Sequence, residues 1–217
     1  MMKSKSTELI FILDRSGSMQ GLESDTMGGF NAMLKEQQNQ EGTCRVTTVL
    51  FDDRYELLHD RENLSVVSPM TAEQYYVRGS TALLDAMGQT IERFGTLQKN
   101  LAPQERAEQV VMVIITDGME NASTRFTYGQ VKHLVQRQQE RFGWEFMFLG
   151  ANIDAIGTAG QMGIRAERAA NYHADSEGMP LVYSAVSATV GCMRQGRQVD
   201  DGWKEPVEAD HRSRQRK

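Results

Sequence analysis

Three short oxygen-bearing side chains lie at alternate positions directly after an apolar run of the sequence. The run is Leu9–Leu13, and Asp14, Ser16 and Ser18 follow it. Carboxylate and hydroxyl oxygens suit hard cations such as Mg²⁺, and Gly17 lets the backbone turn tightly enough for the three side chains to converge. The same residue types also cap helices and build ordinary turns. This segment therefore indicates either a cation site or a structural turn.

Two later segments offer further oxygen atoms. Gly79-Ser80-Thr81 precedes a helical pattern that begins near Ala82, which places the Thr81 hydroxyl where a loop meets a helix. Asp117 follows a second apolar run, Val110–Ile115, and precedes a glycine. Thr81 or its neighbour could simply cap the helix, and Asp117 could simply form a turn at the end of a strand. Each segment thus has a binding interpretation and a structural one.

Strands that alternate with helices would have to position these residues. Apolar runs predict strands buried on both faces, at Leu9–Leu13, Val110–Ile115 and Trp144–Leu149, and Val46–Phe51 is a fourth, more mixed run. Apolar residues at helical spacing lie between the runs, as in Met27, Phe30 and Leu34, then Leu83, Met87 and Ile91, then Val131, Leu134 and Val135. This alternation predicts an α/β fold with a mostly parallel sheet and helices on both faces. In such sheets ligands bind at the carboxyl ends of the strands, where Asp14 and Asp117 lie.

One connection is too short for a helix. Val46–Phe51 and Tyr55–His59 are separated only by Asp52, Asp53 and Arg54, which predicts a hairpin and therefore one antiparallel strand at or near an edge of the sheet. The two acids are more readily explained as turn formers than as a second cation site. Further along, we expect a short helix over 153–162, a strand near 169–172 and a last helix over 177–193.

Length and composition limit the function classes. The 217 residues fit one domain, which we place at 8–196, between a poorly ordered leader at 1–7 and a polar, disordered tail at 197–217. A net charge of -5 gives no reason to expect nucleic-acid binding. Two cysteines, Cys44 and Cys192, and an N-terminus without a signal-peptide pattern predict a cytoplasmic protein that is not bound to a membrane.

Taken together, the three segments resemble the metal-ion-dependent adhesion site of von Willebrand factor A domains. That site combines a DxSxS pattern with a threonine and then an aspartate, and Asp14, Ser16, Ser18, Thr81 and Asp117 match it in the same order. The resemblance covers about residues 8–193 and implies a Rossmann-like, doubly wound sheet with one antiparallel edge strand. Tyr75–Arg78 and Leu83–Ala86 look like a bacterial intracellular branch of the family and, more weakly, like relatives associated with tellurium resistance.

The resemblance also implies a mode of action. Ser16, Ser18 and Thr81 would contact a cation directly, whereas Asp14 and Asp117 would act largely through water. The cation, Mg²⁺ or else Mn²⁺ or Ca²⁺, would keep uncompensated charge and bind a Glu or Asp side chain of a partner protein.

Residues beside the motif have subordinate roles in this interpretation. Asp85 would either orient a hydroxyl from behind or only stabilise the first turn of its helix. Met19, Gly21, Glu120 and Asn121 adjoin the motif in sequence and are candidates for the rim that a partner contacts.

Two alternatives remain beside a protein-binding module. A metal-dependent phosphoester hydrolase is disfavoured because aspartyl-phosphate enzymes carry a second aspartate where this chain has Ser16, and because the sequence shows no GxxxxGK[ST] phosphate loop and no GxGxxG turn after the first strand. The other alternative is a scaffold domain whose metal is purely structural. We therefore expect no enzymatic activity, while the sequence identifies neither the partner nor the oligomeric state.

Overall fold

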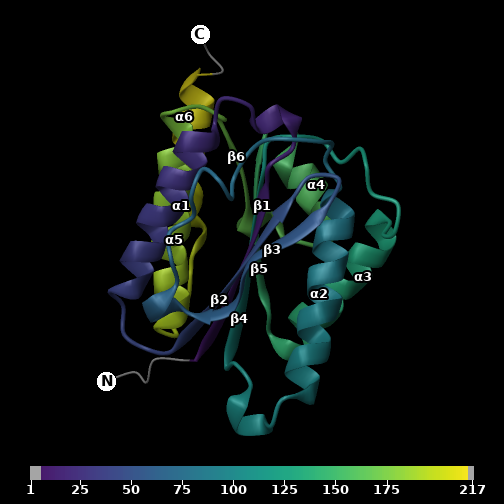
Figure 1. The fold of residues 1–217 in the computed structure, drawn as a ribbon, viewed down its shortest axis with the longest axis vertical. Helices are drawn as coiled ribbons and strands as arrows, with labels where there is room; N and C mark the ends of the chain where they lie inside the picture. Colours follow the sequence, from purple (N-terminus) through teal and green to yellow (C-terminus); the bar gives the residue numbers. More distant parts are fainter. Residues whose placement is uncertain (1–5, 215–217) are drawn as a thin grey trace.

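The computed structural model describes residues 6–214, which form a six-stranded sheet between two layers of helices (Figure 1). The strand order is β3-β2-β1-β4-β5-β6, and all neighbours are parallel except β2 and β3. The strands are β1 (Thr7–Asp14), β2 (Cys44–Phe51), β3 (Tyr55–Asn63), β4 (Gln109–Thr116), β5 (Glu145–Ala151) and β6 (Ala169–Tyr172). The expected mostly parallel sheet with one antiparallel edge strand is confirmed.

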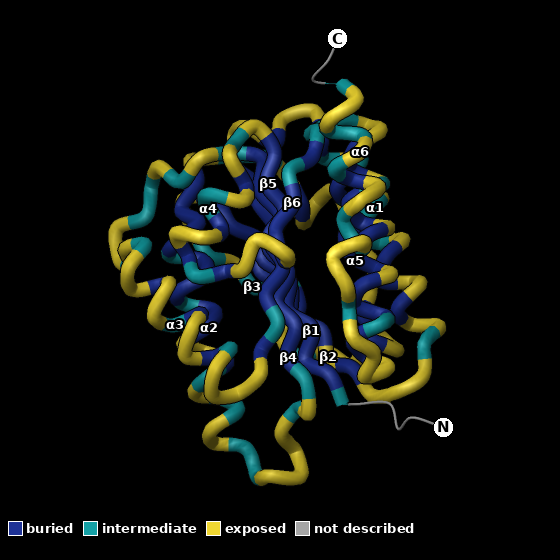
Figure 2. Tube along the Cα trace, turned by 180° about the vertical axis from the view of Figure 1, so that it is seen from behind, coloured by how far each residue is buried: buried dark blue, intermediate teal, exposed yellow. Residues whose placement is uncertain are grey.

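Three helices cover each face of the sheet. The first layer contains α1 (Glu23–Gln38), α5 (Gly178–Arg194) and α6 (Glu205–Arg214), and the second contains α2 (Leu83–Asn100), α3 (Tyr128–Phe142) and α4 (Ala155–Gln161). Short 3₁₀ helices lie at Gly17–Met19, Leu64–Val66, Pro103–Glu105, Ala166–Arg168 and Asp201–Lys204. Figure 2 shows the buried strands in the middle and the exposed positions on the outer faces of the helices.

The central strand β1 supplies both hydrophobic cores. Leu9, Phe11 and Leu13 join the core on the α1 and α5 side, whereas Ile10 and Ile12 join the core on the α2 and α3 side. Successive side chains of a strand point to opposite faces, so a strand covered on both faces must be apolar throughout. This requirement explains the unbroken apolar run, and it places the first polar residue after the run at the edge of the sheet.

The parallel register brings the ends of β1 and β4 together. Thr7 pairs with Gln109 and Leu13 pairs with Ile115, without a shift between them. The residues that follow both strands therefore emerge side by side at the carboxyl edge.

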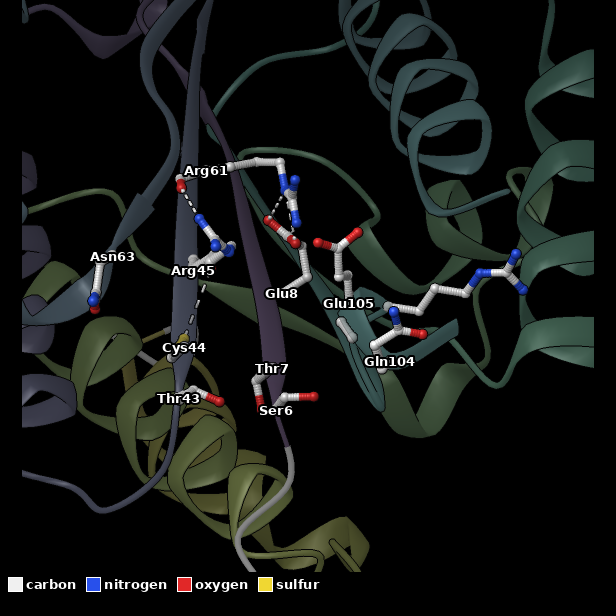
Figure 3. Close-up of a pocket in the computed structure, with 12 residues that line it drawn as sticks. Ser6, Thr7, Glu8, Thr43, Cys44, Arg45, Arg61, Asn63, Gln104 and Glu105 are labelled. Carbon is white, nitrogen blue, oxygen red and sulfur yellow. Dashed lines mark hydrogen bonds and ion pairs between the residues drawn. The ribbon is translucent and has the colours of Figure 1, made fainter. Parts of the chain in front are cut away.

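At the opposite edge of the sheet, where β1 begins, Glu8 of β1 and Arg61 of β3 form an ion pair beside a pocket (Figure 3). Arg61 Nε lies 3.0 Å from Glu8 Oε2, and Glu8 is buried. Arg61 has a φ of 54°, at an irregular stretch of the β2–β3 pairing. Burial raises the pKa of Glu8, and the Arg61 guanidinium opposes that effect. The carboxylate at this end of β1 thus has a cationic partner.

The C-terminal segment differs from the sequence-based expectation. A disordered tail was predicted for 197–217, but residues 201–204 form a 3₁₀ helix and 205–214 form α6. Val207 is buried in the core, Trp203 donates a hydrogen bond to the Glu167 carbonyl at 2.8 Å, and Arg214 forms ion pairs with Asp175 and Glu177. One buried apolar residue and a few long polar side chains attach this segment to the rest of the domain. The low number of apolar residues, on which the prediction of disorder rested, does not reveal such contacts.

Parts of the predicted segments cannot be compared with the structure. Residues 1–5 of the expected leader and 215–217 of the expected tail lie outside the described residues, whereas Thr7 is already the first residue of β1. Within 6–214, no helix combines the length and the apolar character that a membrane crossing needs.

Replacing Val207 with aspartate tests whether α6 is docked. We expect Val207→Asp to lower the free energy of unfolding by about 2 kcal/mol or more, because it places an unpaired carboxylate in an apolar contact. Ala209→Asp introduces an aspartate at an exposed position of the same helix and is expected to lower the free energy of unfolding by about 0.5 kcal/mol or less. Urea denaturation measures both values, and equal losses would show that α6 does not pack as described.

Candidate metal site

Four of the five residues of the motif form one chain of contacts. Thr81 Oγ1 lies 2.9 Å from Ser16 Oγ, and Ser16 Oγ lies 3.1 Å from Ser18 Oγ. Ser18 Oγ in turn donates a hydrogen bond to Asp117 at 2.5 Å. These residues come from the β1–α1 loop, the loop before α2 and the end of β4. Three stretches that are distant in sequence therefore meet at one point on the carboxyl edge of the sheet.

Asp14, the fifth residue of the motif, binds the loop and the strand end that carry the other residues. One of its carboxylate oxygens accepts a hydrogen bond from the Ser16 backbone amide at 2.7 Å. The other accepts one from the Thr116 hydroxyl at 2.5 Å. Because the side chain is completely buried, the carboxylate shapes the loop that carries Ser16 and ties it to β4.

Two buried tyrosines support the strand ends that carry the acids. The Tyr75 hydroxyl donates to the Asp14 carbonyl at 2.5 Å, and the Tyr172 hydroxyl donates to the Thr116 carbonyl at 3.2 Å. Burial raises the pKa of each tyrosine well above its ordinary value, so both stay protonated and keep donating. Nothing in the local sequence pattern shows where an aromatic hydroxyl will point, so this contribution of the two tyrosines was not predicted.

The Thr81 hydroxyl is not used to cap α2. Leu84 N donates to Glu120 at 2.9 Å and Asp85 N donates to Ser123 Oγ at 3.0 Å, so the β4–α3 loop caps the helix instead. The Thr81 backbone amide donates to Asn121 at 2.9 Å. Since residues from another loop satisfy the first amides of the helix, the Thr81 hydroxyl is left to face Ser16.

Asp85 lies in the first turn of α2, as one of its two expected roles requires, and it has a further role that was not expected. Its carboxylate accepts hydrogen bonds from the backbone amides of Thr124, Arg125 and Phe126, each at 2.8 to 2.9 Å. It therefore orders the loop before α3 and contacts none of the motif hydroxyls.

Arg15 lies inside the motif, and its side chain is completely buried. Its guanidinium forms ion pairs with Asp52 at 3.0 Å and with Glu56 at 2.5 Å, and Arg78 also pairs with Asp52 at 2.7 Å. The second oxygen of Asp52 accepts the Arg54 amide, as expected of a turn-forming acid. Burial alone would raise the pKa of Asp52, but these contacts outweigh burial and lower it. This cluster joins the motif loop to the β2–β3 hairpin.

Backbone hydrogen bonds also join the motif loop to the loop before α2. The Arg78 amide donates to the Arg15 carbonyl at 2.9 Å, and the Gly17 amide donates to the Gly79 carbonyl at 3.1 Å. Gly79 has a φ of 68°, and a Cβ added there would lie 2.1 Å from Asp53 Oδ1, so only glycine fits. The loop that carries Thr81 is thus held against the loop that carries Ser16 and Ser18.

The electrostatics of the site differ from those of the Arg15 cluster. Burial raises the pKa of Asp14 to about 6 and also raises the pKa of Asp117. Neither carboxylate forms an ion pair with any side chain of residues 6–214. Two desolvated acids without a cationic partner are unfavourable when ionised, and a bound cation would remove that penalty.

The residues present fit a cation bound largely by hydroxyl groups. Across residues 6–214 there is no group of three or more His, Cys, Asp or Glu side chains that could hold a metal, so hydroxyls would have to complete the ligand set. Gly118 leaves the space for it, since a Cβ added there would lie 2.8 Å from Ser18 Oγ and 3.2 Å from Thr81 Oγ1. Any larger residue would crowd the hydroxyls.

The rim around the site is only partly the one expected. Met19 is buried, whereas Met119, which the sequence analysis did not consider, is 70% exposed beside Gly118. A groove of about 340 Å³ extends from Ser18 and Asp117. Its other lining residues include Gln20, Gly21, Asp25, Asn152 and Asp175. The site thus opens onto a surface with room for a segment of another molecule.

Comparisons with known proteins concern the fold. No protein-family model matches the sequence, and no curated protein matches it. Among solved structures, a von Willebrand factor type A protein from Catenulispora acidiphila has a TM-score of 0.59 at 15% identity, over 90% of this chain and 44% of that one. The chain has the von Willebrand factor A fold.

Two further solved structures are similar in fold to this chain. Proximal thread matrix protein 1 from the mussel byssus, with a zinc-occupied MIDAS motif (the metal-ion-dependent adhesion site), has a TM-score of 0.59 at 14% identity, over 87% of this chain and 46% of that chain. The ArnB paralog VWA2 from Sulfolobus acidocaldarius has a TM-score of 0.51 at 19% identity, over 87% of this chain and 45% of that chain. The chain spans about half the length of these von Willebrand factor A structures.

Glu120 provides a test of how the loop before α2 is held. Its carboxylate accepts hydrogen bonds from Leu84, Ala122 and Ser123, so we expect Glu120→Ala to lower the free energy of unfolding by about 1 to 3 kcal/mol. Glu140→Ala, at an exposed position of α3, is the control and is expected to cost about 0.5 kcal/mol or less. Denaturant unfolding of the two variants would contradict this account if they were equally stable.

Proposed function

We propose that the chain is a divalent-cation-dependent protein-binding module. In this proposal Ser16, Ser18, Thr81, Asp14 and Asp117 hold the cation, and an acidic residue of a partner protein completes its coordination. The observation that carries the proposal is the meeting of three hydroxyls beside two buried carboxylates that have no cationic partner within residues 6–214.

The types of ligand support a hard cation. The site offers carboxylate and hydroxyl oxygens, and the hydroxyls of Thr81, Ser16 and Ser18 already converge, with neighbouring oxygens 2.9 and 3.1 Å apart. We therefore propose Mg²⁺, or else Mn²⁺ or Ca²⁺, as the bound cation.

The choice of partner chemistry follows from the charge of the ligands. Three of the five residues are neutral hydroxyls, and the two carboxylates would act largely through water, so the ligands in direct contact would leave the cation with positive charge to attract a further carboxylate. The cation would supply this electrostatic attraction. The groove beside Ser18 and Asp117 would receive the chain that carries the acid, and exposed Met119 would offer it an apolar contact.

The proposal includes the cellular context that the sequence indicates. We place the protein in the cytoplasm, as a bacterial intracellular form, and neither cysteine forms a disulfide. Binding, and not catalysis, is the proposed activity.

Cation binding is tested by replacing a single hydroxyl. We expect Thr81→Ala to weaken Mg²⁺ binding about tenfold or more in calorimetric titration, because one ligand is lost. Ser80→Ala removes a hydroxyl from the neighbouring exposed position and is expected to bind as the wild type does. Undetectable uptake of Mg²⁺, Mn²⁺ and Ca²⁺ by the folded wild-type protein would refute the proposal.

A second variant tests the space around the cation. We expect Gly118→Ala to weaken Mg²⁺ binding about tenfold or more while the protein stays folded, because its methyl group would crowd Ser18 and Thr81. Gly129→Ala introduces the same methyl group where nothing lies within 4 Å, and its affinity is expected to stay unchanged. Unchanged affinity in the Gly118 variant would remove these hydroxyls from the ligand set.

Partner binding separates the proposal from its alternatives. Proteins retained from a lysate with Mg²⁺ and released by EDTA should also be lost with Thr81→Ala, and replacing single Glu or Asp residues of the identified partner should abolish the interaction. Phosphoester turnover that disappears in Thr81→Ala would indicate a hydrolase instead. A large fall in melting temperature on chelation, with partner binding intact, would indicate a purely structural metal.

A further inference from the structure

A second candidate site lies between α2 and α3, away from the motif. The two helices lie side by side on one face of the sheet (Figure 1), and a groove of about 500 Å³ runs between the C-terminal half of α2, α3 and the start of β4. Ile91, Val110 and Trp144 form buried parts of its lining. Phe142 at its rim is 61% exposed. Its size is that of pockets that bind small molecules, and its lining combines apolar side chains with polar and charged ones.

Two glutamine amides in this groove have unmade hydrogen bonds. Gln138 is 6% exposed, and its side chain has no hydrogen-bond partner anywhere in residues 6–214. The side chain of Gln98 accepts the Ala107 amide at 3.1 Å, but its Nε2 is sealed from solvent without a partner. The Gln138 amide is not among the side-chain groups sealed from solvent, so a ligand in the groove could reach it and form the missing hydrogen bond.

Gly95 provides the room for the Gln138 amide. A Cβ added at Gly95 would lie 2.9 Å from Gln138 Nε2, and both residues line the groove. The amide therefore reaches across from α3 to α2 at a position where α2 has no side chain.

The charges that line the groove include two cations without counterions. Lys99 on α2 and Arg137 on α3 form no ion pair within the described residues, and Arg106 donates only to the backbone carbonyls of Leu101 and Lys99. Glu92 and Glu108 also line the groove, so three cations face two anions. An anionic group beside Arg137 and Lys99 would find an attractive field there.

We propose that this groove binds a small aromatic anion that carries a hydrogen-bonding group. The aromatic ring would lie against Trp144 and Phe142, the hydrogen-bonding group would pair with the Gln138 amide, and the anionic group would lie near Arg137 and Lys99. This site does not depend on the proposed cation function, since none of its lining residues belongs to the motif.

The probe for this site is 8-anilinonaphthalene-1-sulfonate, which combines an aromatic body, an N–H donor and a sulfonate. Titration of the EDTA-treated, folded wild-type protein should give a saturable rise in fluorescence. Arg137→Glu should weaken binding about tenfold, because an attraction becomes a repulsion. Arg141→Glu is the matched control, because it makes the same charge change at an exposed position of α3 outside the groove and should leave the affinity unchanged.

Two further measurements test the other contacts. Gln138→Leu keeps the volume but removes the amide, and should weaken binding several-fold. The uncharged dye N-phenyl-1-naphthylamine should bind more weakly than the sulfonate and should not respond to Arg137→Glu. A signal that does not saturate, or equal affinities in Arg137→Glu and Arg141→Glu, would overturn the proposal. Unchanged or tighter binding in Gln138→Leu would overturn the role of the amide.

Discussion

The hydrogen bond from the Thr116 hydroxyl to Asp14 joins the ends of the two central strands. It forms because β1 and β4 pair in parallel without a register shift, which brings the two residues to the same level at the carboxyl edge. Asp14 then orients the Ser16 amide with its other oxygen, and Asp117 follows Thr116 directly. The positions of the motif loop and of Asp117 therefore both depend on this contact.

A contrast in charge distinguishes this edge from the rest of the sheet. At the other end of β1, Glu8 is matched by Arg61, and in the hairpin Asp52 is matched by Arg15 and Arg78. Asp14 and Asp117 are buried in a similar way but have no cationic partner among residues 6–214. Buried charges without partners are unfavourable unless something else compensates for them, and in the proposed function a bound cation does so.

The helix α2 connects the two regions to which we assign binding. Its N-terminus follows Thr81 and is capped from the β4–α3 loop, and its C-terminal half forms one wall of the groove with Gln98 and Lys99. The two regions share a helix but no residue. Each of them combines a rigid frame with polar groups whose interactions within the chain are incomplete, which is the arrangement expected of a binding surface.

The sequence alone was enough to predict the order of the strands and helices up to α5 and, through the resemblance to von Willebrand factor A domains, the grouping of Asp14, Ser16, Ser18, Thr81 and Asp117 at one edge. Buried parallel strands need continuous apolar runs, and a polar residue after such a run must lie at the edge. Only the tertiary structure decided which partners the other groups have. The cap that Glu120 supplies to α2, the amides held by Asp85, the ion pairs of Arg15 and the docking of α6 all join residues distant along the chain. Such contacts depend on packing in three dimensions, which local spacing does not encode.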